Sequence, residues 1–242
     1  MLNLKIDNLF NINKKVCIVS GASGGLGNKI CKCLIKNGAI VIGLDIKSNN
    51  LNHKKFYFYK IDLQNKYQLN LLKLKIKKKF KAIDSIINLA GVSKPNDFEA
   101  NIRNNLIGPY NLINIFKDIF VKSKGAIVNI TSLNAELGFS NNPGYNSSKG
   151  GLKMLSKAFA NDLAKLKIRV NNIGPGYFLT SMTKKFYKIK KMRAQRLSRI
   201  PLNRYGNTDE LCGAVIFFIS NASSYITGQD LYIDGGLLNK GI

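Results

Sequence analysis

The stretch SGASGGLG, from Ser20 to Gly27, decides the fold expected for this chain. It follows a short apolar run and is followed at once by a helical pattern. Glycines at positions 21, 25 and 27 permit a tight turn and let a diphosphate approach the backbone, and the start of a helix supplies free N–H groups and a favourable dipole. The turn therefore predicts a nucleotide-binding crossover from strand to helix. The alternative is a tight strand–helix turn that binds no ligand.

Apolar, β-rich runs continue along the whole chain. With the run before the turn, they occupy residues 15–20, 39–45, 56–61, 84–89, 125–131, 168–173 and 230–233. Helical patterns lie between them, at residues 68–80, 101–121 and 145–166 among others. Near-continuous apolar strands that alternate with helices predict an α/β fold, with one doubly wound, parallel, seven-stranded sheet in a single domain over residues 1–242. Its ligand crevice is expected at the carboxyl ends of the strands.

Two segments depart from regular alternation. Residues 45–56 are too few for a full crossover helix, so the second crossover is expected to be reduced. Residues 180–202 have the pattern of a basic helical insertion before the last helix and strand.

The charge balance is strongly basic, with 38 Lys and Arg against 13 Asp and Glu, a formal net charge of +25. Such an excess can attract nucleic acid, an acidic membrane surface or anionic substrates. The abundance of Lys, Asn and Ile, all encoded by A/T-rich codons, offers compositional drift as a simpler explanation. A nucleic-acid motif is absent from the sequence, so no nucleic-acid partner is expected; a steep salt dependence of DNA retention would indicate one.

Neither membrane insertion nor secretion is expected. No apolar run approaches the roughly 20 residues that cross a bilayer, and the first residues lack an uninterrupted apolar core for a signal. The four cysteines, Cys17, Cys31, Cys33 and Cys212, have no paired C-x-x-C spacing. We therefore expect reduced thiols in a cytoplasmic protein.

Asp45 ends the second predicted strand, 18 residues after Gly27. A carboxylate at this place can accept hydrogen bonds from the adenosine ribose hydroxyls and repels a 2′-phosphate. The next residue is Ile46 rather than Arg, which favours NAD over NADP, although Lys47 is close by. The alternative is that Asp45 caps a loop.

Tyr145 and Lys149 are four residues apart in GYNSSKGGLKML and so share one face of a helix. Ser132 follows the predicted strand at 125–131, at the edge where the crevice is expected. An ammonium about 4 Å from the phenol would contribute roughly 4 kcal/mol at an effective dielectric of about 20. That amounts to about three pKa units, enough to bring a phenol toward neutral pH. Taken alone, the Y-x-x-x-K spacing usually means a solvated helix face.

These motifs together resemble the short-chain dehydrogenase/reductase family over nearly the whole chain. SGASGGLG is similar to the family's T-G-x-x-x-G-x-G turn, with Ser20 in place of Thr, and NITSL places Ser132 thirteen residues before Tyr145, the family's usual interval. Further segments that resemble the family, in order, are IDL with Asp62, INLAG with Asn88, Ala90 and Gly91, NNLIG with Asn105, RVNNIGPGYFLTSM with Pro175, Gly176 and Thr180, and YITGQDLYIDGG. The resemblance implies a Rossmann fold and an NAD(P)-dependent oxidoreductase acting on CH–OH groups.

The resemblance also implies individual roles. Tyr145 would transfer the proton, Ser132 would orient the carbonyl or alcohol oxygen, and Lys149 would lower the phenol pKa and bind the nicotinamide ribose. Asn105, at a kink in its helix, would hold a water that extends the proton path. The residues expected to bind the cofactor are Ser20, Gly21, Ser23, Gly25, Leu26, Gly27, Asp45, Asp62, Leu63, Asn88, Ala90, Gly91, Tyr145, Lys149, Pro175, Gly176 and Thr180. No metal is expected. The lone histidine, His53, is expected in a solvated loop, which leaves no Ser-His-Asp hydrolase to build.

The segment at about residues 177–205, which covers the substrate in this family, is basic. Its cations are Lys184, Lys185, Lys188, Lys190, Lys191, Arg193, Arg196, Arg199 and Arg204. Cations near a pocket favour an anionic small molecule such as a sugar acid, and the alternative is a solvated basic helix. PGYFLTSMT and IPLNRYG are similar to the gluconate 5-dehydrogenase branch. Two other hypotheses remain: a 3-oxoacyl carrier-protein reductase, which usually prefers NADPH, and a nucleotide-binding regulatory protein without turnover.

Only 13 residues separate Gly91 from Asn105, fewer than the family commonly has. One wall of the active-site mouth is therefore expected to be trimmed. The family also implies a homotetramer of dihedral symmetry, built through the helices at 101–121 and 145–166 and through the last strand.

Overall fold

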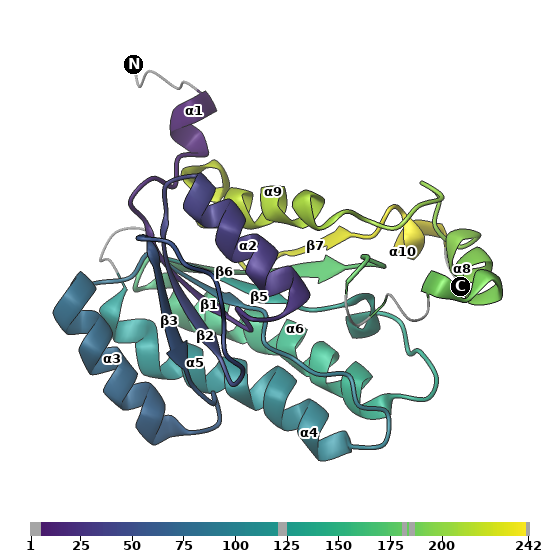
Figure 1. Cartoon of the computed structure of the whole chain (residues 1–242), viewed down its shortest axis with the longest axis horizontal. Helices are drawn as coiled ribbons and strands as arrows, with labels where there is room; N and C mark the ends of the chain where they lie inside the picture. Colours follow the sequence, from purple (N-terminus) through teal and green to yellow (C-terminus); the bar gives the residue numbers. More distant parts are fainter. Residues whose placement is uncertain (1–5, 121–124, 181–182, 184–186, 241–242) are drawn as a thin grey trace.

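Seven parallel strands form one sheet in the order β3-β2-β1-β4-β5-β6-β7 (Figure 1). The computed structural model describes residues 6–120, 125–180, 183 and 187–240. The strands are β1 (Val16–Ser20), β2 (Ile40–Asp45), β3 (Phe56–Lys60), β4 (Ser85–Asn88), β5 (Gly125–Ile130), β6 (Ile168–Pro175) and β7 (Asp230–Ile233). The strand order reverses beside β1, which pairs with both β2 and β4. Such a reversal places a crevice at the carboxyl ends of the strands.

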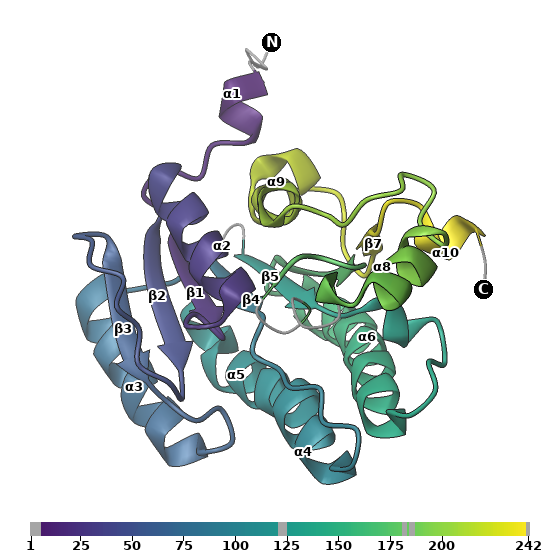
Figure 2. The ribbon, with the colours of Figure 1, turned by 45° about the vertical axis from the view of Figure 1, so that its right-hand side comes forward.

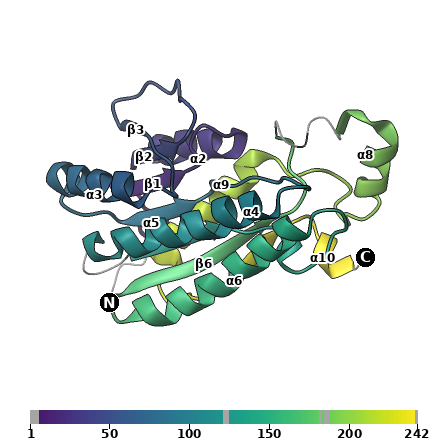
Figure 3. The ribbon, with the colours of Figure 1, turned by 90° about the horizontal axis from the view of Figure 1, so that it is seen from below.

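Helices cover both faces of the sheet (Figures 2 and 3). One face is covered by α2 (Gly25–Lys36) and α9 (Thr208–Ile219), and the other by α3 (Lys66–Phe80), α5 (Gly108–Phe116) and α6 (Pro143–Ala164). The shorter elements are α1 (Ile6–Leu9), α4 (Phe98–Ile102), η1 (Arg103–Ile107), η2 (Lys117–Ile119), η3 (Leu133–Ala135), α8 (Lys190–Leu197), η4 (Asn221–Ser223) and α10 (Leu237–Lys240).

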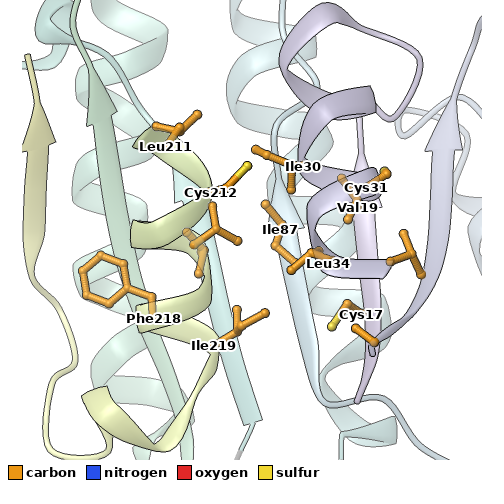
Figure 4. Close-up of a cluster of buried hydrophobic side chains, with 14 of the residues drawn as sticks. Cys17, Val19, Ile30, Cys31, Leu34, Ile87, Leu211, Cys212, Phe218 and Ile219 are labelled. Carbon is orange, nitrogen blue, oxygen red and sulfur yellow. The ribbon is translucent and has the colours of Figure 1, made fainter. Parts of the chain in front are cut away.

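The sheet is buried on both faces, because its strands are apolar at consecutive positions rather than at alternate ones. Every residue of β1, β4 and β5 is buried. Figure 4 shows the core under α2 and α9, where Ile30 and Leu34 of α2 face Leu211 and Ile219 of α9 above the central strands. Burying one such side chain contributes about 1.5–3 kcal/mol to the free energy of folding. The packing of helices on both faces of the sheet therefore holds the strand ends that border the crevice in place.

The predicted strands and the reduced second crossover are confirmed. All seven runs form strands within two residues of the expected bounds, and residues 46–55, all of them described, contain no helix. The expected helix at 101–121 is broken into α4, η1, α5 and η2, and its last residue, Val121, lies outside the described residues. In the basic insertion the described helical residues are Tyr187 and Lys188, followed by α8.

The break between α4 and α5 has a local cause. Residues Arg103–Ile107 form a turn of π-helix, in which the Gly108 N–H donates to the Arg103 carbonyl five residues earlier. Pro109 follows, and it has no N–H to donate to the Asn105 carbonyl four residues before it. A proline at this point widens the helix because its ring also crowds that carbonyl. The kink expected at Asn105 is therefore present.

Candidate active site

A cleft of about 520 Å³ opens at the carboxyl ends of the strands. The glycine turn after β1, the end of β2, the loop after β4, the end of β5 and the end of β6 all contribute to its wall. The predicted residues that line it are Gly21, Ser23, Gly25, Leu26, Asp45, Asp62, Leu63, Ala90, Gly91, Ser132, Tyr145, Lys149, Pro175, Gly176 and Thr180. Residues from seven places in the sequence thus meet in one cavity, because the residues after β3 and the start of α6 also reach it.

Glycine is required at two positions of the turn. Gly21 has a φ of +70°, and a Cβ there would lie 2.7 Å from the Ala90 nitrogen. At Gly27 a Cβ would lie 2.0 Å from the Gly21 carbonyl oxygen, so α2 can pack against the turn only without a side chain here. The Gly24 cap offers no side-chain oxygen to the first turn of α2. The free N–H groups of that turn open into the cleft and fit a diphosphate.

Asp45 lies where β2 ends, and both of its oxygens accept main-chain hydrogen bonds. Oδ2 accepts from the Ser23 N–H at 2.9 Å and Oδ1 from the Lys47 N–H at 2.9 Å. The carboxylate therefore braces the glycine turn and also borders the cleft. Asp62 borders the same end, where its Oδ1 accepts from the Gln64 N–H at 2.9 Å. Each carboxylate keeps lone pairs for a further donor.

Ser132, Tyr145 and Lys149 line the opposite end of the cleft. Ser132 is the N-cap of η3, two residues after the end of β5, whereas Tyr145 and Lys149 lie on the first two turns of α6. The start of α6 is held by Pro143 and by the Asn142 side chain, which accepts from the Tyr145 N–H at 3.2 Å. The Ser132 side chain is close enough to the Tyr145 phenol to lower its pKa. The structure thus brings the three predicted residues together.

The Lys149 ammonium is placed differently from the expectation. Its Nζ donates to the Ile130 carbonyl at 2.8 Å and lies 5.7 Å from the centroid of the Tyr145 ring. Burial lowers the pKa of Lys149 to about 8. Burial also raises the pKa of the Tyr145 phenol, and the contact with Ser132 opposes that rise. The predicted lowering of the phenol pKa by Lys149 is therefore not among these effects, because the ammonium donates to the end of β5.

Asn105 is fully buried and its side chain is occupied by protein groups. Its Oδ1 accepts from the Val92 N–H at 2.8 Å, while its Nδ2 donates to the Val92 carbonyl at 2.8 Å and to Ser148 Oγ at 2.9 Å. The amide therefore ties the loop after β4 to α6. A water on the expected proton path would have to bind the Asn105 main-chain carbonyl, which Pro109 leaves without its regular donor.

Four predicted residues lie behind the cleft wall rather than on it: Ser20, Gly27, Asn88 and Asn105. Ser20 Oγ accepts from the N–H groups of Leu89 and Ala90, at 3.1 and 3.2 Å, so it shapes the loop after β4. Asn88 Nδ2 donates to Asn129 Oδ1 at 2.7 Å inside the sheet. These residues hold the wall in place and do not face the cavity.

The structure adds residues that sequence reasoning missed. Val92, Asn104 and Phe178 line the cleft beside the predicted residues. Val92 and Phe178 each lie within two residues of a predicted glycine, and this proximity in sequence could have indicated that they line the cleft. Asn134 contacts Ser132, and Asn146 contacts Asn134: Asn134 Oδ1 accepts from Ser132 Oγ at 3.0 Å, and Asn134 Nδ2 donates to Asn146 Oδ1 at 2.6 Å. Their spacing of twelve residues carries no motif.

The basic segment at about residues 177–205 borders the cleft through Phe178, Thr180 and Thr183, and several of its side chains pack on aromatic rings. Tyr205 stacks on Tyr177 with ring centroids 5.7 Å apart and meets Tyr187 edge-on at 5.1 Å. Arg196 lies 4.7 Å from the centroid of Tyr177, and Arg193 lies 5.2 Å from that of Tyr187. Among the described residues of this segment, no cation borders the cleft. Lys184 and Lys185 lie outside the described residues.

The loop after Gly91 is held by a contact with α6, and the lone histidine lies in an exposed loop, as predicted. The loop from Val92 to α4 is short and is fastened to α6 where Asn142 Nδ2 donates to Ser93 Oγ at 2.9 Å. His53 is exposed in the loop before β3, with Nδ1 accepting from the Lys55 N–H at 3.0 Å. In the described part of the chain, no group of three or more His, Cys, Asp or Glu could hold a metal ion, and no helix could span a bilayer.

The parallel sheet and the glycine turn define a dinucleotide-binding α/β protein, and comparison with known proteins narrows the class. A family model described as Enoyl-(Acyl carrier protein) reductase matches residues 21–238. The chain is 35% identical to the 3-oxoacyl-[acyl-carrier-protein] reductase of Thermotoga maritima, over 93% of this chain and 98% of that one. It is 31% identical to the 2-dehydro-3-deoxy-D-gluconate 5-dehydrogenase of Formosa agariphila, over 95% of each.

A solved structure is similar over nearly the full length. The gluconate 5-dehydrogenase of Burkholderia cenocepacia, in complex with NADP and tartrate, superposes with a TM-score of 0.88 at 27% identity, covering 97% of this chain and 99% of that one. The chain belongs to the short-chain dehydrogenase/reductase family of oxidoreductases.

Proposed function

We propose that the protein interconverts a secondary alcohol and a ketone with NAD(P), and that Tyr145 transfers the proton. The observation that carries the proposal is the cleft itself, because Ser132, Tyr145 and Lys149 border the same cavity as the glycine turn. A nicotinamide bound there would supply or accept the hydride. The turn, the uncapped start of α2 and Asp45 would hold the nucleotide at the other end.

The side chains of the protein would transfer the proton, orient the substrate and bind the ribose. Tyr145 would exchange its phenolic proton with the substrate oxygen, and Ser132, in reach of that phenol, would hold the oxygen in place. Lys149 would bind the ribose beside the nicotinamide. Its pKa of about 8 lets it pass a proton near neutral pH. The Asn105 carbonyl would hold the water that connects this lysine to solvent.

We propose NAD as the preferred cofactor. The Asp45 carboxylate, fixed by two main-chain N–H groups, borders the cleft where the adenosine ribose is expected. A negative charge at this place opposes a 2′-phosphate. The NADP in the Burkholderia relative argues for testing both cofactors, as does Lys47, which also borders the cleft.

For the substrate we propose a sugar acid. The 2-dehydro-3-deoxy-D-gluconate and gluconate dehydrogenases among the similar proteins support this class. The charges along the cleft are compatible with it: Asp45 and Asp62 border the nucleotide end, whereas Lys149 is the charged side chain beside Tyr145 among the described lining residues.

The second candidate is reduction of a 3-oxoacyl thioester on a carrier protein. The 35% identity to the Thermotoga reductase favours it. The exposed Lys188, Lys190, Lys191 and Arg199 beside the mouth would suit an acidic carrier. Asp45 speaks against the NADPH preference that is usual for that activity.

A substrate panel separates the candidates. Oxidation of D-gluconate and related sugar acids, and reduction of an acetoacetyl thioester, are measured with both cofactors. We expect sugar-acid oxidation with NAD, and we expect Tyr145→Phe to abolish it while nucleotide binding is kept. Turnover of the thioester alone would establish the second candidate. Nucleotide binding without any turnover would leave a regulatory protein.

We also propose a homotetramer in the cytoplasm. The outer faces of η1, α5 and α6 expose Ile107, Tyr110 and Met154, and the edge strand β7 exposes Leu231. Apolar side chains gathered on these elements suit subunit contacts.

All four cysteines are free thiols, in keeping with a reducing compartment. Light scattering of the purified protein measures the number of subunits directly.

A further inference from the structure

Two thiols that are far apart in the sequence lie together between α2 and α9. Cys33 is in the last turn of α2, and Cys212 is in the second turn of α9. Cys212 belongs to the buried core between these helices, and Cys33 is partly buried against the same core. Figure 4 shows Cys212 directed from α9 toward Ile30 of α2. Cys33 shares that side of α2 with Ile30, because residues three apart lie on one helix face.

The packing of the two helices brings their backbones close enough for a covalent link. α2 and α9 contact each other directly above the sheet. The axes of two helices in contact lie about 8–10 Å apart, and each Cα lies about 2.3 Å from its own axis. The Cα atoms of facing residues therefore come within the roughly 7 Å that a disulfide can span. A bond between the two sulfurs would join the helices without unfolding either of them.

The two thiols differ in a way that suits Cys33 as the attacking group. A hydrogen bond with the Cys212 thiol lowers the pKa of Cys33 to about 7, so a large part of Cys33 is thiolate at neutral pH. Asn37 Nδ2 is a second donor, 3.8 Å from Cys33 Sγ. The same hydrogen bond raises the pKa of Cys212, which keeps its proton. The pair thus combines one partly exposed thiolate with one buried thiol.

We propose that Cys33 and Cys212 form a site of reversible oxidation, at which hydrogen peroxide or an organic hydroperoxide converts the two thiols to a disulfide between α2 and α9. Cys33 reacts with the oxidant because its sulfur is the more exposed of the two. Cys212 then reacts with oxidised Cys33. Neither residue lines the cleft, so this site is separate from the proposed active site and does not rest on the proposed function.

The reaction has two steps with hydrogen peroxide as the oxidant. The Cys33 thiolate attacks one peroxide oxygen, an S–O bond forms, the O–O bond breaks, and hydroxide leaves with Cys33 as a sulfenic acid. The Cys212 sulfur then attacks the Cys33 sulfur, an S–S bond forms, and the S–O bond breaks. The departing hydroxyl group takes the Cys212 proton and leaves as water. The two thiols together lose two protons and two electrons, and the peroxide becomes two molecules of water.

The first step also prepares Cys212 for the second. The pKa of Cys212 is raised first by its hydrogen bond with Cys33, then by burial and by the negative charge of Cys33. Oxidation consumes the Cys33 thiolate, so the hydrogen bond to it and its charge are both lost. Cys212 therefore gives up its proton more readily once its neighbour is oxidised, which favours the disulfide over further oxidation of Cys33.

Cys17 and Cys31 provide a control within the same chain. Both are completely buried, and burial raises the pKa of each to about 12. Cys31 is only two residues from Cys33, but it points to a different side of α2. A buried, protonated thiol reacts slowly with peroxide. We therefore expect Cys17 and Cys31 to stay reduced under conditions that oxidise the pair.

Peptide mapping of the whole protein tests the proposal. The wild type, freed of reductant, is treated with hydrogen peroxide at about pH 7.5, its remaining thiols are blocked with N-ethylmaleimide in urea, and unreduced peptides are analysed by mass spectrometry. We expect one pair of peptides joined through Cys33 and Cys212, which dithiothreitol separates, in a protein that runs as a monomer on a non-reducing gel. Cys17 and Cys31 should be recovered as blocked thiols.

Three alanine variants assign the two steps. In Cys212→Ala, oxidation of Cys33 should stop at the sulfenic acid, which dimedone traps. In Cys33→Ala, Cys212 should remain a thiol at the peroxide concentration that links the wild type. Cys31→Ala is the matched control on α2 and should form the link as the wild type does.

Three results would overturn the proposal. They are Cys33 carried to the sulfinic acid in the wild type without a link, a link through Cys17 or Cys31, and no oxidation of Cys33 at all. The map of the wild type needs no variant, so it decides the matter if Cys212→Ala does not fold.

Discussion

The buried ammonium of Lys149 should make the folded chain less stable at neutral pH than at high pH, and Lys149→Met should remove that dependence. Lys149 is 5% exposed, and its ammonium donates to the Ile130 carbonyl. Burial lowers its pKa from 10.5 to about 8. At a pH between these two values, Lys149 is therefore protonated in the unfolded chain and largely deprotonated in the folded chain.

The sign and size follow from that difference. A state that binds more protons is disfavoured as pH rises, so the free energy of unfolding increases between pH 8 and about pH 10.5. A shift of this size corresponds to about 3 kcal/mol in total, of which about 2 kcal/mol should have developed by about pH 9.5. Methionine does not titrate and lacks this gain. Other groups titrate alike in both proteins and cancel in the difference.

Urea unfolding of both proteins at pH 7 and at about pH 9.5, at equal protein concentration, measures the effect. On raising the pH, the free energy of unfolding of the wild type should increase by about 2 kcal/mol relative to that of Lys149→Met. The absolute difference at pH 7 also contains the Ile130 carbonyl left without its partner, so the change with pH is the diagnostic quantity. A difference that stays constant across this range refutes a buried, destabilised ammonium.

Three further predictions concern the cofactor, a thiol and the glycine turn. Asp45→Asn keeps the shape of the side chain and removes its charge, so the ratio of kcat/KM with NADP to that with NAD should rise by roughly tenfold or more; an unchanged ratio would remove Asp45 from cofactor selection. A hydrogen bond from Cys212 lowers the pKa of Cys33 to about 7, whereas burial raises that of Cys17 to about 12. Iodoacetamide at pH 7.5 should therefore modify Cys33 first in peptide mass spectra, and equal labelling of both would contradict this. Gly27→Ala should lower the free energy of unfolding by about 1–3 kcal/mol, because its Cβ meets the turn backbone. Gly138→Ala, where a Cβ meets nothing within 4 Å, should be silent, and equal urea midpoints for the two variants would exclude the clash.

The fold was predictable because its signals are local and repeated. Strands buried on both faces read as continuous apolar runs, and the glycine turn marks the crossover at which the strand order later reverses. The sequence also predicted that Ser132, Tyr145 and Lys149 share a cleft, since strand ends and the first turns of helices meet at one edge of a parallel sheet. The short second crossover followed from counting residues.

What the sequence could not predict depends on side-chain packing. The ammonium of Lys149 turns to the Ile130 carbonyl instead of the phenol, and no spacing encodes that choice. The amide of Asn105 is used up by Val92 and Ser148. Asn134 and Asn146 meet across a loop whose path depends on where α6 packs. Motifs thus identified the residues that share the cleft, whereas the orientation of their side chains is decided by tertiary contacts.

Transfer of deuterium from a labelled cofactor tests the central claim most directly. NADH or NADPH carrying deuterium on both C4 positions is incubated with the keto acid that corresponds to the sugar acid turned over. The account predicts deuterium at the carbinol carbon of the product, in the wild type and not in Tyr145→Phe. A product without deuterium, or full transfer in the variant, would contradict hydride transfer assisted by this phenol.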